Sequence, residues 1–484
     1  MEADLSNYCV PRFRLLDDRQ IMRIHHSVLS ILDEVGVRIY HNQAIDLLAG
    51  HGAKIKADKV VQIPSFLVEE AIAAAPSSLV IYNRDKAPVM ELGERKIFFG
   101  TGTDLPKSID LKTREIRDTK AEDVVASTII SDAMPNIDFI GSYGLPKDVP
   151  TGLHYIRCFQ LEAENSKKPI FFTAESQEDL RIIWEMAGAI AGDSEALARH
   201  PFIISYSEPT SPLSHSKEAM AKLIFCAEKR IPVNYTPALL AGSTGPVTLA
   251  GALAVAVAEA LSGLVVHQLT NKGAPIISGV AATTMDMLEA TVSYTSPEFR
   301  LTHSAYADLF HYYGLPIWGT AGCSDSHFPD LQTGAEYAFT LLNAALDGTN
   351  LIHDCGYLGQ GFVASPELII FADELIGMVK RYIQGFSLDT EHLALDVIKH
   401  VGPGGHFLAE KHTLDYCMQE HWRPAILNRK SLPNWLKNGK KTVNQKLVEK
   451  ALEILQTHHP EPLSPEVKTN LDQIWSAAQK KSRR

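Results

Sequence analysis

The sequence predicts an α/β fold, a (β/α)8 TIM barrel with an N-terminal lead-in and a C-terminal helical extension. Its 484 residues can accommodate a barrel of about 250 residues with additions at both ends. Between residues 96 and 355, eight short apolar or β-branched runs begin 30 to 43 residues apart, the length of a βα unit with its loops. Helix-like stretches separate these runs. A doubly wound parallel sheet is the alternative that this pattern leaves open.

The first 94 residues alternate helix-like and turn-like segments and are expected to form a lead-in domain. Apolar residues at helical spacing predict a helix over 21–35, and Gly36 is expected to end it. A second helix is predicted over 65–75, directly after Pro64.

The barrel is expected to span residues 95–400. Proline stands at or near the start of five predicted strands, where its missing N–H is least damaging. Pro246 is expected to open a long helix that ends at 271–273, and Gly348 to end a helix that begins near 334. The predicted strands are 96–103, 137–144, 169–174, 202–207, 232–236, 275–280, 316–320 and 350–355.

After Pro403 the alternation of strands and helices stops, and residues 401–484 are expected to form a helical extension. Helical segments are predicted over 410–420, 443–456 and 465–480, with loops rich in Pro and Gly between them. We expect this extension to make a contact between the subunits of a homo-oligomer.

The composition argues against several classes of partner and location. A net charge of −11 leaves no basic footprint for a nucleic acid or an anionic membrane. The most apolar stretch, 246–269, is interrupted by Glu259 and His267, which favours a buried helix over a membrane span. The six cysteines include no CxxC pair, and the chain opens with the acidic residues 1–4. We therefore expect a cytoplasmic protein without a disulfide framework.

The predicted strand ends are rich in aromatic residues and poor in cations. In a parallel barrel these ends line the active site, and only Lys107 and Lys147 bring positive charge to them. Aromatic faces attract a quaternary ammonium by about 0.5–2 kcal/mol per contact. An ordinary apolar barrel interior is the alternative reading of any single ring. The residues expected to form an aromatic cage are Phe99, Tyr143, Tyr206, Tyr357 and Phe362.

Other chemistries have weaker support in the sequence. The Gly-rich turns lack the GxGxxG or GxxxxGK[ST] spacing that binds phosphates, and no GxSxG nucleophile elbow is present. One alternative stays open, because cysteine and histidine at neighbouring strand ends suit zinc. That site would combine Cys323, His327, His353 and Cys355.

Five segments of the chain resemble the trimethylamine methyltransferase family. The resemblance extends from Leu15 to the C-terminal helices and implies a TIM barrel that moves a methyl group from a methylamine to the cobalt of a separate corrinoid protein. The cobalamin would therefore be bound by the partner, with no cofactor or metal held permanently by this chain. The segments are 99–102, 209–213, 245–251, 322–325 with 329, 330 and 332, and 402–408.

The residue at one family position changes the expected substrate. Trimethylamine-specific members carry pyrrolysine there, whereas this sequence has Cys323. The chain is thus similar to the branch without pyrrolysine, which demethylates quaternary amines. The resemblance implies glycine betaine as the first candidate, with dimethylglycine as product, and proline betaine, carnitine or γ-butyrobetaine as alternatives.

The chemistry of a quaternary amine agrees with that branch. Its nitrogen has no lone pair and leaves as a neutral amine, so no general acid or base is expected. Positive charge decreases toward the transition state, which favours aromatic contacts and orientation over a carboxylate pressed against the ammonium. His353 and His327 are the candidate donors to a betaine carboxylate. A protein that binds quaternary amines without turnover is the non-enzymatic alternative.

Overall fold

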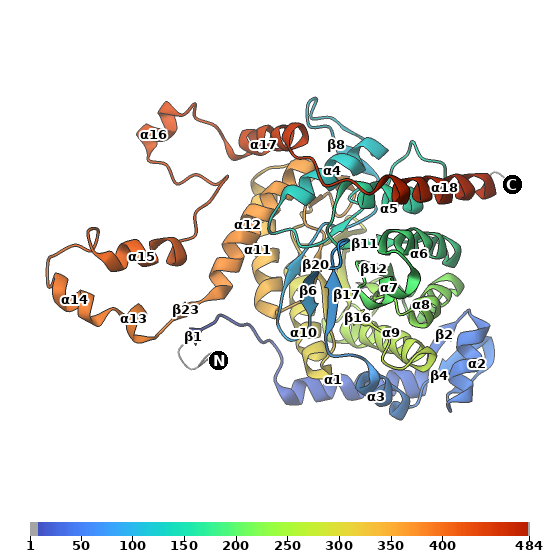
Figure 1. The fold of residues 1–484 in the computed structure, drawn as a ribbon. Coiled ribbons are helices and arrows are strands. Elements are labelled where there is room, and N and C mark those ends of the chain that lie inside the picture. The colour runs from blue at the N-terminus through green and yellow to red at the C-terminus, as the bar shows by residue number, and fades with distance from the viewer. Residues whose placement is uncertain (1–7, 483–484) are drawn as a thin grey trace.

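A computed structural model describes residues 8–482, and eight parallel strands lie at its centre (Figure 1). Each of the eight segments predicted as strands contains one of them. The eight strands are β7 (Phe98–Phe99), β10 (Ile140–Gly141), β11 (Ile170–Thr173), β12 (Ile203–Ser207), β14 (Val233–Tyr235), β16 (Ile276–Ser278), β19 (Trp318–Thr320) and β20 (Leu351–His353).

The strands pair in chain order and in one direction. Five form a parallel sheet in the order β10-β11-β12-β14-β16, and three form a parallel sheet in the order β19-β20-β7. Two isolated parallel bridges, Gly100 with Phe139 and Ser278 with Ile317, connect the edges of the two sheets. The carboxyl ends of all eight strands therefore lie on one side of the molecule.

Helices follow the strands and cover their outer faces (Figure 1). Gly348 ends α11 in a left-handed conformation with φ 72°, as its place in the sequence predicted. The helices are α4 (Ala121–Ala133), α5 (His154–Asn165), α6 (Gln177–Ala191), α7 (Ser194–Arg199), α8 (Lys217–Lys229), α9 (Leu249–Thr270), α10 (Pro297–Tyr313), α11 (Leu331–Asp347) and α12 (Pro366–Gln384).

Helix α9 is long and apolar enough to cross a membrane, with a mean hydropathy of 2.1, but 78% of its apolar window is buried inside the protein. Both of its polar interruptions, Glu259 and His267, are buried as well. The Glu259 carboxylate accepts hydrogen bonds from the Leu213 amide and the Ser211 hydroxyl, each at 2.7 Å. The interruptions are therefore part of a core helix, as the sequence predicted. A cytoplasmic location stays a prediction.

Further short strands lie in the loops and near the ends of the chain. Most lie in the connections that follow the carboxyl ends of the eight strands, so they shape the loops around those ends. They are β8 (Lys107–Ile109), β9 (Ile116–Asp118), β13 (Ser214–His215), β15 (Ala238–Ala241), β17 (Ala281–Asp286), β18 (Thr291–Ser293), β21 (Tyr357–Leu358) and β22 (Val363–Ala364), with β1 (Tyr8–Cys9) pairing β23 (Phe386–Ser387) outside them.

The N-terminal region packs against α9 and against the amino ends of the strands. Its first predicted helix is split into α1 and a π-helical turn that ends at Gly36, and the second is α3, as expected. Residues 1–7, which include the acidic opening of the chain, lie outside the described residues. The elements are α1 (Asp18–Ser30), β2 (Val37–Ile39), α2 (Asn42–Gly50), β3 (Lys54–Ile55), β4 (Val60–Gln62), α3 (Ser65–Ala74), β5 (Leu79–Tyr82) and β6 (Pro88–Leu92).

The β5–β6 hairpin fills the space between the strands at their amino ends. The Tyr82 amide donates to Pro201 O, directly before β12, and the Asn350 side-chain amide donates to Gly93 O, directly after β6. Four buried hairpin side chains form one cluster with side chains from the inner face of the strands. The cluster contains Leu79, Ile81, Met90 and Leu92 from the hairpin and Phe139, Phe171, Ile204, Ile277, Trp318 and Leu351 from the strands.

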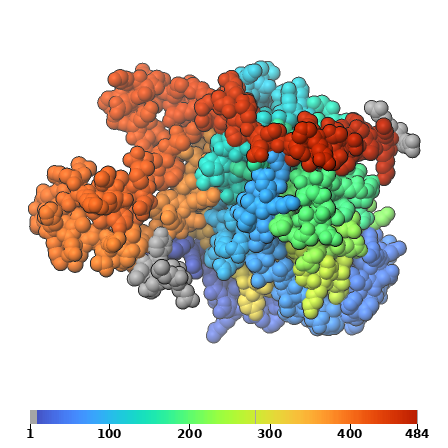
Figure 2. All heavy atoms as spheres, viewed as in Figure 1, coloured from blue at the N-terminus to red at the C-terminus, as the bar shows by residue number. Residues whose placement is uncertain are grey.

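The C-terminal region has two parts with different packing. Helices α17 and α18 bury Leu447, Ile454 and Leu471 against the body, whereas α13 to α16 bury no residue and project from it (Figure 2). The three predicted helical segments correspond to α15, α17 and α18. The elements are α13 (Thr390–Leu393), α14 (Leu395–Val401), α15 (Lys411–Glu420), α16 (Leu432–Lys437), α17 (Val443–Thr457) and α18 (Pro465–Ser482).

The hairpin packing can be tested with two neighbouring residues. Ile81 is fully buried in the cluster, whereas the side chain of Val80 points to solvent. We expect Ile81→Ala to lower the free energy of unfolding by about 2–5 kcal/mol, because it leaves a cavity in a dry cluster. Val80→Ala, the matched control, should change it by less than about 0.5 kcal/mol. Equal losses in urea titrations of the two variants would contradict a hairpin core inside the strands.

Candidate functional site

Four rings from four strands meet on the inner face, toward the carboxyl ends. The His353 ring lies 4.5 Å from the Trp318 ring and 5.3 Å from the Phe171 ring, both edge-to-face, and 6.4 Å from the Tyr206 ring. Tyr206 in turn lies 5.6 Å from Phe171 and 6.2 Å from Trp318. Alternate residues of a strand share a face, so this aromatic cluster continues the inner core above the hairpin. We call these four residues the aromatic cluster.

Two buried nitrogen donors near the cluster have no hydrogen-bond acceptor or ion-pair partner among the described residues. They are Trp318 Nε1 and the side-chain amide nitrogen of Asn234, which pairs with Tyr206 and so lies on the same face. The His353 Nδ1 atom instead lies 2.8 Å from Asp354 Oδ1, within ion-pair distance. Buried donors are almost always paired in native proteins. The Trp318 and Asn234 donors can therefore bond to the oxygens of a bound molecule.

Three carboxylates lie beside the aromatic cluster. Asp104 accepts a hydrogen bond from the Thr173 hydroxyl at 3.1 Å, and its other oxygen is buried without a donor. Glu208 accepts from the Tyr206 hydroxyl at 2.7 Å, and Asp354 accepts from the Thr320 hydroxyl. Burial raises the pKa of Asp104 to about 6 and also raises the pKa of Glu208, because the charged form loses hydration.

The nearest cations do not neutralise these carboxylates directly. Lys222 donates to Ala174 O at 2.7 Å, and Arg300 donates to Thr320 O at 2.8 Å. Burial lowers the pKa of both groups. Within residues 8–482, no lysine or arginine side chain lies within ion-pair distance of any of the three carboxylates. The site therefore combines aromatic faces with an excess of negative charge.

Glycine permits the close packing next to this site. A Cβ at Gly102 would collide with the Asp354 carboxylate and the Tyr357 hydroxyl, and one at Gly100 would collide with the Phe139 ring. The glycines of the segment 99–102 are thus required by close approach of side chains from neighbouring strands. This segment is one of those that carry the family resemblance.

The structure distributes the five predicted cage residues over four environments. Tyr206 belongs to the aromatic cluster. Tyr143 and Tyr357 pack against each other at 6.2 Å, but their hydroxyls donate to the backbone oxygens of Ser365 and Thr103 and so hold loops. Phe99 lies on the outer face among helix side chains, with Lys380 Nζ 5.9 Å from its ring, and Phe362 is 59% exposed.

The two predicted carboxylate donors also differ in position. His353 is buried in the aromatic cluster, as described above, and is the last residue of β20. His327 is exposed in the loop after β19, where its ring lies over the backbone of Gly359. Only His353 lies among the side chains that meet on the inner face.

Cys323, the residue at which the family resemblance implied a departure from the trimethylamine-specific members, is buried just beyond β19. Its sulfur lies 4.0 Å from the Thr320 hydroxyl, and burial raises the pKa of the thiol well above its usual value. The Cys355 sulfur faces Ala321 O instead. In the part of the chain that the structure describes, no group of three or more His, Cys, Asp or Glu side chains could hold a metal ion. The structure thus does not assemble the zinc site considered from sequence.

Phe171, Trp318 and Asn234 are not among the site residues predicted from the sequence. Phe171 and Phe172 are adjacent in one strand, and only one of them can point inward, so composition alone could not choose between them. The pairing of Phe171 with Ile204, two residues before Tyr206, provides the signal, because paired residues share a face. Applied to β19, the same alternation places Trp318 and Thr320 inward.

Comparison with known proteins shows the family to which the chain belongs. Residues 3–482 match the family model described as trimethylamine methyltransferase (MTTB). The chain is 34% identical over 461 residues to the trimethylamine methyltransferase MttB of Desulfitobacterium hafniense, covering 94% of this chain and 92% of that protein. It is 30% identical over 464 residues to a glycine betaine methyltransferase of the same species, covering 96% of each.

A solved structure extends the likeness to the fold. The Methanosarcina barkeri monomethylamine methyltransferase (MtmB) matches 97% of this chain and 88% of its own length, with a TM-score of 0.52 at 11% identity. At that identity the match concerns the fold alone. The sequence matches over nearly the full chain confirm the resemblance predicted from its motifs. This chain belongs to the trimethylamine methyltransferase family.

Proposed function

We propose that this chain moves a methyl group from a quaternary amine to the cobalt of a separate corrinoid protein and releases the tertiary amine. The observation that carries the proposal is the aromatic cluster beside carboxylates that no lysine or arginine neutralises. Reduced cobalt on the partner supplies the nucleophile. Glycine betaine is the first candidate substrate and dimethylglycine the product, in keeping with Cys323 and with the 30% identical glycine betaine methyltransferase.

In this proposal the aromatic cluster binds the ammonium. The faces of Phe171, Tyr206 and Trp318 each contribute about 0.5–2 kcal/mol of attraction to a desolvated cation. These contacts are diffuse, so they hold the ammonium in place while its positive charge decreases during transfer. The residues act by orientation and need no acid or base, because the leaving amine is neutral.

The carboxylates favour binding of the cation rather than the chemical step. An ion is attracted more strongly in a poorly hydrated site than in water. Asp104, with one oxygen buried, therefore lowers the free energy of the bound ammonium more than Glu208, which is exposed, does. Because the cation becomes a neutral amine, this attraction is weaker in the transition state than in the substrate complex. We infer that the two carboxylates increase affinity for the substrate and do not accelerate the transfer step.

A betaine also carries a carboxylate, which needs donors. The Trp318 Nε1–H and the Asn234 side-chain amide are the unpaired buried donors near the ammonium position, and His353 lies beside them in the aromatic cluster. Donors of this kind can bind a carboxylate by hydrogen bonds without a lysine or arginine. The same argument holds for proline betaine, carnitine and γ-butyrobetaine.

A second candidate follows from the charge of the site. Three carboxylates repel the carboxylate of any betaine, whereas a quaternary ammonium without an acid group, such as choline or tetramethylammonium, meets only attraction. The absence of an ion pair from lysine or arginine to Asp104, Glu208 or Asp354 in the described residues favours this class. The substrate panel below distinguishes the two classes.

The loops around the strand ends provide a surface for the methyl acceptor. Large apolar side chains are exposed on four of these loops, and Met287 and Val247 approach each other across Gly242. Apolar side chains exposed together mark a site of protein association. We propose that the corrinoid protein docks here. The side chains are Val247, Met287, Leu288, Phe328, Leu331 and Phe362.

We also propose that the eight strands close into one (β/α)8 barrel. The two parallel bridges support closure, because they connect both edges of the five-stranded sheet to the three-stranded sheet. The fold likeness to the monomethylamine methyltransferase agrees with it. In a closed barrel the aromatic cluster would lie at the catalytic end, where (β/α)8 enzymes bind substrates.

The reaction is tested with a panel of amines and chemically reduced free cobalamin. We expect glycine betaine or a quaternary ammonium without an acid group to be demethylated, and trimethylamine to be inactive, with methylcobalamin measured by absorbance. If only choline or tetramethylammonium reacts, the second candidate replaces glycine betaine. Binding by calorimetry without turnover, even with the cognate corrinoid protein, would favour a non-enzymatic binder.

The aromatic cluster predicts a selective loss of affinity. Trp318→Leu and Tyr206→Leu should each weaken binding of the quaternary amine by roughly 2- to 30-fold, because each removes one ring from the ammonium. Phe99→Leu is the control, since Phe99 lies on the outer face. Affinity is measured by isothermal titration calorimetry. An equal loss of affinity in Phe99→Leu would contradict the aromatic cluster as the binding site and favour the cage predicted from sequence alone.

Titration of the Asp104 carboxyl should make the affinity for a quaternary ammonium depend on pH. Its pKa is about 6, so it is charged at pH 7.5 and protonated at pH 5. The other charged groups that affect it are Glu208, which raises its pKa, and Lys222, which lowers it. We expect affinity for tetramethylammonium to decrease as pH falls through about 6, and Asp104→Asn to weaken binding at pH 7.5 and flatten this profile. An unchanged profile in the variant would exclude Asp104 as its source.

A further inference from the structure

The segment from Phe386 to Lys441 leaves the body after α12 and returns to it at α17. We call these 56 residues the arm. Figures 1 and 2 show it projecting from the compact part of the molecule. Of its residues only Ile426 is buried, where its amide and those of Ala425 and Leu427 donate to the Glu374 carboxylate of α12.

The arm exposes more apolar surface than a free segment can keep. A chain that buries so little apolar surface does not offset the entropy lost in ordering it. Yet many of its large apolar side chains are exposed, which is typical of a segment that packs against another protein surface. They are Phe386, Leu388, Leu393, Leu395, Ile398, Phe407, Leu408, Leu414, Met418, Leu432 and Leu436.

The helices of the arm also need a partner to persist. The longest, α15, has ten residues, and the others have four to seven. Isolated helices shorter than about 12–15 residues are marginal in water. The arm therefore needs another surface to stay ordered, which favours a partner that is bound permanently.

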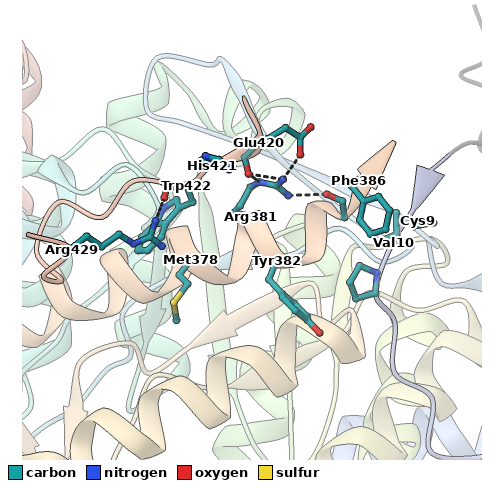
Figure 3. A pocket seen from close by; sticks show the side chains of 12 residues that line it. Cys9, Val10, Met378, Arg381, Tyr382, Phe386, Glu420, His421, Trp422 and Arg429 are labelled. Atoms are coloured by element: carbon teal, nitrogen blue, oxygen red, sulfur yellow. Dashed lines mark hydrogen bonds and ion pairs between the residues drawn. The ribbon is translucent and has the colours of Figure 1, made fainter. Parts of the chain in front are cut away.

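A groove of about 1090 Å³ lies at the root of the arm (Figure 3). Met378 and Tyr382 of α12, Phe386 and Trp422 provide its apolar lining. Arg381 spans it and donates to Glu420 O at 2.9 Å and to Gly385 O at 2.8 Å, which fixes the two ends of the first arm segment. The groove is thus a fixed, partly apolar surface at the point where the arm begins.

We propose that the arm packs on a second copy of this chain, so that two copies exchange arms and each groove receives apolar side chains of the other arm. Charge supports this partner. The arm holds eight lysine and arginine residues against six aspartate and glutamate residues, a net charge of +2. Since the whole chain has a net charge of −11, the remainder carries −13 and attracts the arm of another copy.

The position of the arm argues against the methyl acceptor as its partner. Helix α12 begins next to the strand carboxyl ends and runs for 19 residues, so the root of the arm lies about 28 Å from that side. An acceptor must also leave after each transfer, whereas the arm needs a permanent partner. Two identical chains satisfy both arms at once through one two-fold interface.

The test combines a change in the arm with a matched change elsewhere. Leu408 and Leu414 of the arm are 86% and 76% exposed, and Leu288 on the β17–β18 hairpin is 94% exposed. By light scattering, the wild type should have twice the 53.3 kDa chain mass. Leu408→Asp with Leu414→Asp should raise the dissociation constant by at least roughly 100-fold, because two carboxylates would be buried unpaired. Leu288→Asp should stay dimeric.

Hydrogen exchange of the same proteins distinguishes loss of the interface from loss of folding. Amides of 390–436 should be protected in the wild type and exchange rapidly in the arm variant, with protection of α9 unchanged in both. A monomeric wild type at about 10 μM, or an arm variant that remains dimeric, would overturn the proposal. Arm amides that become protected only when the corrinoid protein is added would assign the arm to the acceptor instead.

Discussion

Alternation of side chains along the parallel strands is the constraint on which this structure depends. Helices cover the outer faces of the strands, so every second residue must be apolar and pack against them, as Phe99, Phe172 and Ile203 do. The inner faces are filled from one end by the β5–β6 hairpin. Only the inward positions near the carboxyl ends stay free of this requirement, and there the chain places rings, hydroxyls and carboxylates.

This constraint explains which parts of the molecule could be predicted from sequence. All eight strands, α9, α11 and the three longer C-terminal helices follow from local patterns, because apolar runs, Pro and Gly act over a few residues. The start of α9 is an exception in detail, since the helix begins at Leu249 and not at Pro246. The family also follows, because its motifs are long. Facing directions do not follow, because they depend on register. Phe99 was therefore predicted to belong to the cage although it points outward, and Phe171 and Trp318 were not predicted.

The other differences between the predicted and the observed site arise from hydrogen-bond partners of the side chains. Tyr143 and Tyr357 lie near the strand ends, as expected, but their hydroxyls bond to the backbone of loops that only the folded chain brings together. The acidic character of the site has the same origin. Asp104, Glu208 and Asp354 come from three separate loops or strand ends, and none is unusual in its own sequence context. Their proximity, and the lack of a direct cationic partner in the described residues, are properties of the fold.

The two regions of exposed apolar surface differ in how they can be used. Around the strand ends, single side chains such as Leu288 and Phe362 stand on loops held by the body, so this surface is stable whether or not it is covered. That suits a methyl acceptor, which must dock and leave. The short helices of the arm have no core of their own. If the partner left, their apolar side chains would be exposed to water and the helices would unfold. Such a surface is better suited to a lasting contact. If both proposals hold, subunit association and turnover take place at opposite ends of α12.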